Sequence, residues 1–204
     1  MEPIFSRRDA WAGGSYDLAI KLGARDDARV RRALEALWSA VDVDGCYQHQ
    51  DLEPEQQPRI GVGALPLDAA LHGVAHLGAR PPIPCRTVIV QLDDGEDWIY
   101  FCLPMGSLAR IVDVGAFPFA SGGTLSWRPV ADEWLCALAR RVFGTVPFQL
   151  ALLGWDGDDF RGGDNVSTAA DVPDERWVGF LVADGCELQW FAANRGAPFT
   201  FEPT

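Results

Sequence analysis

Apolar and polar residues alternate along residues 16–22, a pattern typical of a strand with one buried face. Asp26 and Asp27 follow, and both are residue types that stabilise the first turn of a helix. From there, apolar residues recur every three or four positions and form one stripe, made of Val30, Ala33, Leu34, Leu37, Trp38 and Val41. The pattern therefore predicts a strand followed by an amphipathic helix, which ends before Asp44-Gly45.

Four short runs rich in β-branched and aromatic residues are grouped in pairs later in the chain. The runs cover residues 87–92, 98–103, 177–182 and 188–192. Asp94-Gly95 lies between the first two runs and Asp184-Gly185 between the last two, and Asp-Gly is a strong signal for a two-residue hairpin turn. We therefore expect two β-hairpins.

A second helix is predicted from Pro129 onward. Proline suits the first turn of a helix, and a new apolar stripe at helical spacing follows it, made of Val130, Trp134, Leu135, Leu138 and Val142. The pattern also predicts a strand over residues 149–153, a strand over residues 124–128 and a short helix over residues 67–77. Ser107 is expected to cap another short helix.

The two halves of the chain show these elements in a similar order. Residues 15–107 and residues 123–197 each contain a strand, a helix and an Asp-Gly hairpin, which predicts two related β-α-β-β units. Asp-Gly turns arise independently in many proteins, so the similarity reflects either a duplication or a coincidence of hairpin chemistry. One helix cannot bury both faces of a hairpin, so the two units are expected to share a core. The predicted fold is a single α+β domain over residues 1–204, with a mostly antiparallel sheet and two main helices packed on it.

The chain has 204 residues, of which 29 are acidic and 17 basic, and its net charge is −12. Such a surface repels phosphate groups, which disfavours nucleic acids and anionic membranes as partners. No apolar run approaches the roughly 18 residues of a membrane span, and the first residues lack the apolar region of a signal peptide. Five cysteines without a CxxC motif are typical of reduced thiols in a cytosolic protein. We therefore expect a cytoplasmic protein that carries no cofactor.

Residues 156–175 concentrate negative charge, because they hold seven acidic residues and one basic residue, Arg161. Tryptophans lie at both ends of this run and on a strand predicted nearby. Aromatic rings beside carboxylates suit a cationic group, and they equally suit a binding hot spot for a protein. The alternative is that the rings pack the sheet against its helices and that the acidic run only solvates a loop. The candidate binding residues are Trp155, Asp156, Asp158, Asp159, Asp164, Trp177 and Trp190.

Asp68, His72 and His76 lie at i, i+4 and i+8, so they share one face of the helix predicted over residues 67–77. Two imidazoles and a carboxylate in that arrangement are able to hold a divalent metal. Gly73 stands where the zinc-protease motif has a glutamate, so that motif is not present.

The sequence is compatible with two functions of different classes. The leading hypothesis is a non-catalytic acidic binding protein whose partner is a basic protein or a cationic small molecule. Neutralisation of a basic toxin by an immunity protein is one form of it, because acidic surfaces speed association with basic partners. The alternative is a metal-assisted hydrolase that uses Asp68, His72 and His76. Because the sequence contains no recognisable catalytic motif, we favour the binding protein over the enzyme.

Overall fold

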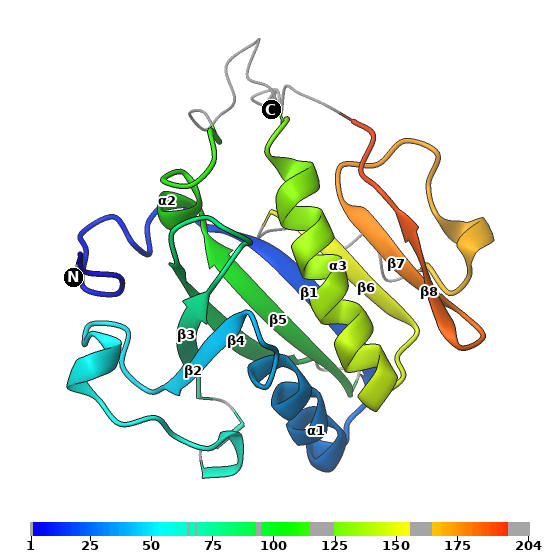
Figure 1. Ribbon diagram of the computed structural model, residues 1–204. Helices are drawn as coiled ribbons and strands as arrows, with labels where there is room; N and C mark the ends of the chain where they lie inside the picture. Colours follow the sequence, from blue (N-terminus) through cyan, green and yellow to red (C-terminus); the bar gives the residue numbers. More distant parts are fainter. Residues whose placement is uncertain are drawn as a thin grey trace, which may run out of the picture.

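Within the described residues, eight strands pair into one antiparallel sheet (Figure 1). The computed structural model describes residues 2–64, 66–67, 69–92, 95–114, 125–155 and 165–195. The strands are β1 (Ser15–Ala24), β2 (Val43–Tyr47), β3 (Leu71–Ala75), β4 (Ile83–Gln91), β5 (Glu96–Pro104), β6 (Leu150–Trp155), β7 (Gly179–Asp184) and β8 (Glu187–Phe191). Their order across the sheet is β2-β3-β4-β5-β1-β6-β7-β8.

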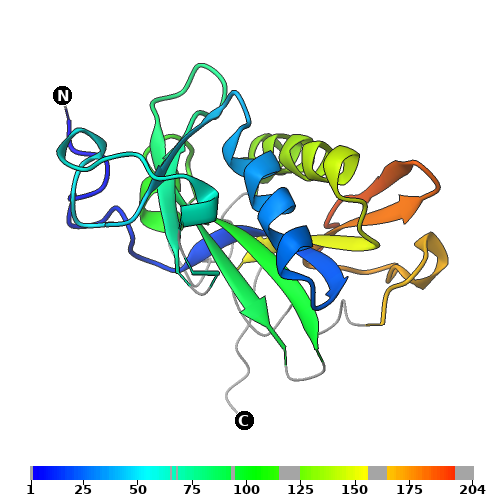
Figure 2. The ribbon, with the colours of Figure 1, turned by 90° about the horizontal axis from the view of Figure 1, so that it is seen from below.

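Two long helices lie side by side on one face of the sheet (Figures 1 and 2). The helical elements are α1 (Asp27–Trp38), α3 (Arg128–Thr145), the single turn α2 (Met105–Leu108) and the 3₁₀ turns η1 (Pro54–Gln56), η2 (Val62–Ala64) and η4 (Ala169–Asp171). Asp26 caps α1, because its carboxylate accepts a hydrogen bond of 3.0 Å from the backbone N–H of Arg29. At 18 residues, α3 is the longest helix in the described ranges, and neither it nor another described helix has the length and apolar character needed to cross a membrane.

The main core lies between the sheet and these two helices. Alternate side chains of β1 enter it and meet apolar side chains of both helices: Tyr16, Leu18, Ile20 and Leu22 from β1, Leu34 and Leu37 from α1, and Leu135 and Val142 from α3. Burying one aliphatic side chain fully stabilises a fold by about 1.5–3 kcal/mol. The alternation along β1 therefore fixes which face of the strand lies toward the helices.

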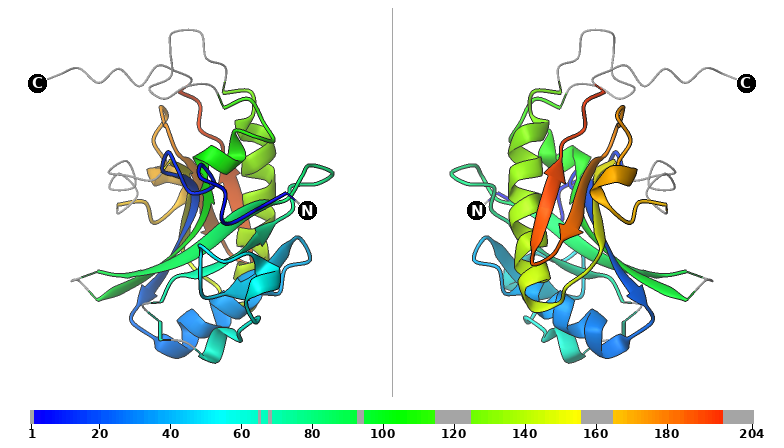
Figure 3. Two further views of the ribbon diagram at one scale, coloured as in Figure 1. Left: turned by 90° about the vertical axis from the view of Figure 1, so that its left-hand side faces the viewer. Right: turned by 90° about the vertical axis from the view of Figure 1, so that its right-hand side faces the viewer.

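The opposite face of the sheet is covered near its two ends. Residues at the N-terminus cover β3, where Trp11 packs edge-on against His72 with 5.3 Å between the ring centroids. Residues 165–178 pass over β6 and β7, on the other side of the sheet from α3 (Figure 3), and Val166 joins Phe180 in a second apolar cluster there. The sheet is thus a central layer with the helices on one face and irregular segments on the other.

Several predicted elements are confirmed. The strand and helix expected at the start of the chain are β1 and α1, and the two hairpins expected around the Asp-Gly pairs are β4–β5 and β7–β8. Asp184 itself still pairs with Glu187, so the turn of β7–β8 consists of Gly185 and Cys186. The second helix and the strand expected over residues 149–153 are α3 and β6. Val41 was wrongly included in the first apolar stripe, because α1 ends at Trp38 and the Val41 side chain is 93% exposed.

The helix predicted over residues 67–77 is wrong, because residues 71–75 form β3 between β2 and β4. Gly73 explains part of the difference. A Cβ at this position would come within 2.3 Å of the Trp38 ring, so glycine lets β3 pass directly under α1. Pairing with two neighbouring strands outweighs the helical spacing of the two histidines.

Two smaller predictions are also wrong. In the part of residues 124–128 that the structure describes, Ser126 and Trp127 form a turn and Arg128 begins α3, so no strand forms there. Ser107 does not cap a helix. It lies inside α2, where its hydroxyl donates a hydrogen bond of 2.7 Å to the carbonyl of Ala10.

The predicted internal duplication is not confirmed. The β4–β5 hairpin pairs directly with β1, whereas β6 separates the β7–β8 hairpin from β1. Among the described residues, no strand precedes α3 in the second half as β1 precedes α1 in the first. The two halves contribute to the shared sheet in different ways.

Candidate binding pocket

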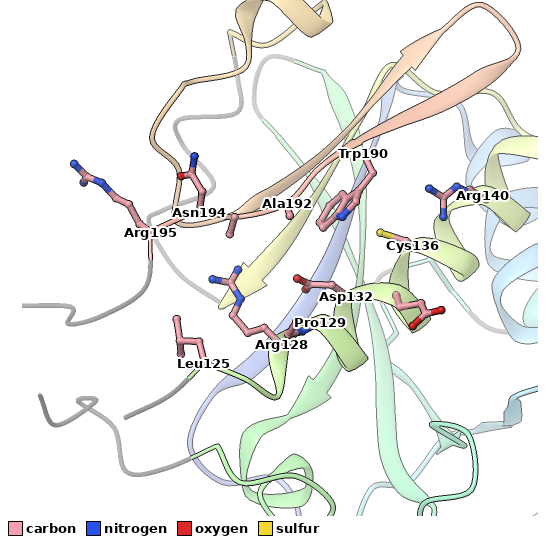
Figure 4. Close-up of a pocket in the computed structure, with 12 residues that line it drawn as sticks. Leu125, Arg128, Pro129, Asp132, Cys136, Arg140, Trp190, Ala192, Asn194 and Arg195 are labelled. Atoms are coloured by element: carbon pink, nitrogen blue, oxygen red, sulfur yellow. The ribbon is translucent and has the colours of Figure 1, made fainter. Parts of the chain in front are cut away.

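A pocket of about 380 Å³ lies between α3 and the end of β8 (Figure 4). Its lining residues come from α3 and from the segment that begins at Trp190: Leu125, Arg128, Pro129, Asp132, Glu133, Cys136, Arg140, Trp190, Ala192, Ala193, Asn194 and Arg195. Pockets that hold small molecules in proteins measure about 300–1,000 Å³. The space is therefore sufficient for a small ligand, and its floor is mostly apolar.

The helical period of α3 determines which of its side chains line the pocket. Arg128, Asp132, Cys136 and Arg140 are four residues apart, so they follow one another along a single face of α3. Figure 4 shows this face opposite the ring of Trp190. Gly179 of β7 is required for that ring position, because a Cβ there would come within 2.0 Å of the Trp190 ring.

The helical wall of the pocket contains a buried charge network, which we define as Arg128, Tyr16 and Asp132. Nε of Arg128 donates to the Tyr16 hydroxyl at 2.9 Å, and this hydroxyl donates to Oδ1 of Asp132 at 2.5 Å. Nη2 of Arg128 donates to the carbonyl of Trp177 at 2.9 Å. Arg128 is 4% exposed and Asp132 is 7% exposed, so both charges are held almost out of water and are balanced through Tyr16.

Burial shifts the two acidic groups of this network in the same direction. It raises the pKa of Tyr16 well above its ordinary value, and the neighbouring Asp132 carboxylate adds to the shift. Burial also raises the pKa of Asp132, while the hydrogen bond from Tyr16 and the charge of Arg128 oppose this rise. The protonation of the pocket wall is therefore set by one coupled group of residues.

The three tryptophans predicted as binding residues, Trp155, Trp177 and Trp190, play different parts in the structure. The Arg128 guanidinium lies over the Trp155 ring at 4.9 Å, and the Arg195 guanidinium lies over the Trp177 ring at 5.4 Å. These two rings thus stack on cations of the protein itself. Trp190 alone of the three lines the pocket.

The charges at the pocket are not typical of the molecule, because three arginines and two acidic residues line it. Arg128 is balanced by Asp132 through Tyr16, and Arg195 forms an ion pair with Glu175 outside the pocket. Arg140 is exposed and forms no hydrogen bond or ion pair with another described residue. An acidic protein thus presents at this pocket an arginine that no described residue pairs with.

The structure gives the two histidines of the proposed metal site different surroundings. His72 lies on β3 with its ring buried, and burial lowers its pKa. His76 follows the strand, and its Nε2 lies 3.1 Å from Oδ2 of Asp44. Asp68 lies outside the described residues, and no group of three or more His, Cys, Asp or Glu side chains in the described ranges has the arrangement of a metal site. The helical face on which this hypothesis depended does not exist.

The predicted acidic binding residues Asp156, Asp158, Asp159 and Asp164 all lie outside the described residues. The described remainder of the run exposes Asp171, Asp174 and Glu175. Asp171 accepts hydrogen bonds from the backbone N–H groups of Ser167 and Thr168 and from the Thr168 hydroxyl, which lower its pKa. Its carboxylate therefore orders the turn at η4, whereas Asp174 and Glu175 are side chains of the open surface.

Sequence patterns did not predict Tyr16, Arg128, Asp132 and Arg140 as site residues. The local signal was the four-residue spacing of Arg128, Asp132, Cys136 and Arg140 beside the apolar stripe of α3. Comparison of the chain with family models, with curated proteins and with solved structures found no match.

Proposed function

We propose that this protein is a non-catalytic binding protein and that the pocket between α3 and β8 holds a small ligand. The observation that carries the proposal is a pocket of about 380 Å³ in which the Trp190 ring and small apolar side chains face charged groups of α3. This combination is typical of ligand sites in proteins. The buried charge network supports the proposal further, because it holds the polar wall rigid before a ligand arrives.

The four buried thiols of the chain favour binding over nucleophilic catalysis. Burial raises the pKa of Cys136, at the pocket wall, to about 12. It also raises the pKa of Cys46 to about 12 and that of Cys85 and Cys102 well above the ordinary value. A thiol attacks as the thiolate, so these four groups are poor nucleophiles at neutral pH.

Filling the pocket tests this proposal. Ala192 lines the pocket, and Ala192→Trp places a large ring in it. Ala28 is exposed on the first turn of α1, so Ala28→Trp is the matched control. We expect a screen of small molecules by thermal shift and native mass spectrometry to find ligands that bind the wild type one to one and raise its Tm. Ala192→Trp should abolish that binding and Ala28→Trp should retain it; binding that survives Ala192→Trp would place the site elsewhere.

A basic partner that docks on the acidic segment 156–175 is a second candidate function. It is favoured by the net charge of −12 and by the exposed Asp174 and Glu175 beside Trp177. Neutralisation of a basic toxin is one form of it. The partner recovered by pull-down should be basic, and its association should slow as salt rises.

Neutralising the acidic segment tests this second candidate. The substitutions are Asp156→Asn, Asp158→Asn and Asp159→Asn together. The matched control removes three exposed acidic charges elsewhere, with Asp42→Asn, Asp51→Asn and Glu55→Gln. Stopped-flow association at low salt should slow in the first triple variant more than in the second. Equal rates would show that net charge alone, and not this segment, attracts the partner.

A further inference from the structure

We infer that the ligand of the pocket between α3 and β8 is a small carboxylate with an aromatic or apolar body, and that Arg140 binds its charged group while Trp190 packs against its body. This inference rests on the proposed function and adds the chemical class of the ligand. The charge of this ligand is opposite to that of the cationic ligand predicted from the sequence.

Of the three arginines that line the pocket, Arg140 is the one that no described residue pairs with. It lies one turn beyond Cys136 on the pocket face of α3, and in Figure 4 its guanidinium faces the side of the pocket where Cys136 and Trp190 lie. It is exposed and has no ionic partner among the described residues. At the Cys136 thiol, burial is the main cause of the raised pKa, and the charge of Arg140 opposes this rise. The Arg140 guanidinium is therefore the positive group nearest this end of the pocket.

The acidic residues of the lining do not cancel this charge. Asp132 is engaged by Tyr16 and balanced by Arg128. Glu133 is exposed and precedes Arg140 by seven residues, which is about 10 Å along a helix axis. That separation is about one screening length at 0.1 M salt, so an anion beside Arg140 interacts with Arg140 more strongly than with Glu133.

The shape of the site indicates the rest of the ligand. The Trp190 ring and the small side chains Ala192 and Ala193 form one wall, and Pro129 and Cys136 belong to the helical wall. Such walls favour a planar ring, because stacking on tryptophan stabilises a bound ring beyond the burial of its apolar area. A guanidinium binds a carboxylate through two parallel hydrogen bonds, which a lysine cannot reproduce.

The net charge of the protein gives this binding an unusual dependence on salt. A molecule with charge −12 repels an anionic ligand at long range, and added salt screens this repulsion. The contact with Arg140 acts at short range inside the pocket and is screened less. The association rate of the anionic ligand should therefore rise with salt, whereas that of a basic partner on the acidic segment should fall.

Three matched probes test the inference by isothermal titration calorimetry: naphthoate, its uncharged amide naphthamide, and the cationic naphthylmethylammonium. We expect the wild type to bind naphthoate most tightly. Arg140→Gln should weaken naphthoate about tenfold, as expected for the loss of a charge-assisted contact, and should leave naphthamide within about twofold. Arg140→Lys should recover only part of the affinity. The control Arg32→Gln removes an exposed arginine of α1 and should change the affinity for neither naphthoate nor naphthamide.

The outcomes separate the inference from the function on which it rests. If Arg140→Gln leaves the ratio of naphthoate to naphthamide affinity unchanged, Arg140 does not bind the carboxylate and the inference is wrong. If naphthylmethylammonium binds most tightly, the ligand is cationic and the inference is equally wrong. If no probe binds, the inference is wrong, and the small-molecule screen still decides the proposed function. If Ala192→Trp weakens none of the probes that bind, the pocket is not their binding site and the proposed function fails as well.

Discussion

Replacing Tyr16 by phenylalanine removes one hydroxyl from the centre of the buried charge network and leaves the aromatic ring in place. That hydroxyl accepts a hydrogen bond from Nε of Arg128 at 2.9 Å and donates one to Oδ1 of Asp132 at 2.5 Å. Arg128 keeps its bond to the carbonyl of Trp177 in the variant. Asp132 keeps none, because Tyr16 is its one hydrogen-bond donor among the described residues.

The size of the effect follows from the burial of the two groups that lose a partner. Leaving a buried polar group without a partner costs about 1–3 kcal/mol, and a charged group costs more. Asp132 borders the pocket, where water can replace part of the lost bond, so we expect a total of about 2–4 kcal/mol. In a domain of about 200 residues each kcal/mol lowers Tm by roughly 2–4 °C, which gives a decrease of about 4–16 °C.

The loss of stability should depend on pH. The hydrogen bond from Tyr16 favours the charged form of Asp132 and so lowers a pKa that burial raises. Without it, the pKa of Asp132 in the folded protein rises further above that in the unfolded chain. A folded state that binds its proton more tightly than the unfolded state loses stability as pH rises through the interval between the two pKa values. The deficit of Tyr16→Phe should therefore be larger at neutral pH than at a pH below the pKa of Asp132 in the folded wild type.

Urea unfolding, followed by tryptophan fluorescence and far-UV circular dichroism at neutral and at acidic pH, measures this deficit. Tyr47→Phe is the matched control, because the Tyr47 hydroxyl accepts a single hydrogen bond of 3.3 Å from the exposed Arg59. The Tyr47→Phe substitution should lower the free energy of unfolding by under about 1 kcal/mol. Equal losses in the two variants, or a loss in Tyr16→Phe that is the same at both pH values, would refute the reasoning about the network.

Further predictions concern the core, the pocket wall and the thiols. Leu34→Asp buries an unpaired charge at a cost of several kcal/mol and should unfold the protein; a soluble variant with the wild-type Tm would contradict the assigned core. Gly179→Ala should lower Tm because of its contact with Trp190, whereas Gly63→Ala, which meets open space, should not. Brief iodoacetamide treatment of the native protein should modify the exposed Cys186 and spare the four buried thiols; mass spectrometry would locate the label.

Sequence patterns predicted the elements whose signals are local. Alternation along β1, the Asp26 cap of α1 and the Asp-Gly pairs of the hairpins each depend on residues close together in the chain, and the strand, the helix and both hairpins formed as expected. Residues 71–75 could not be predicted in the same way. Their strand depends on β2 and β4 and on the contact of Gly73 with Trp38, which lies 35 residues earlier in the chain.

The site was predictable only in part, for the same reason. Tryptophans near the acidic run were recognised from composition, and one of the three candidates, Trp190, lines the pocket. The charge network was not recognised, because Tyr16 and Asp132 are 116 residues apart and neither is unusual in its local context. The four-residue spacing along α3 is visible in the sequence, but it indicates a pocket only once the structure places β8 opposite that face.

The central position of β1 has a consequence for how the chain folds. Tyr16 pairs with Leu103 on one side and with Trp155 on the other, so its two partners are 87 and 139 residues further along the chain. Such distant pairings close large loops and make folding slow. During synthesis β5 emerges well before β6, and in that interval β1 has an open edge with no strand to pair it. The nascent chain is therefore most prone to aggregate after β5 has emerged and before β6 does, and it is the arrival of the second half that closes the sheet.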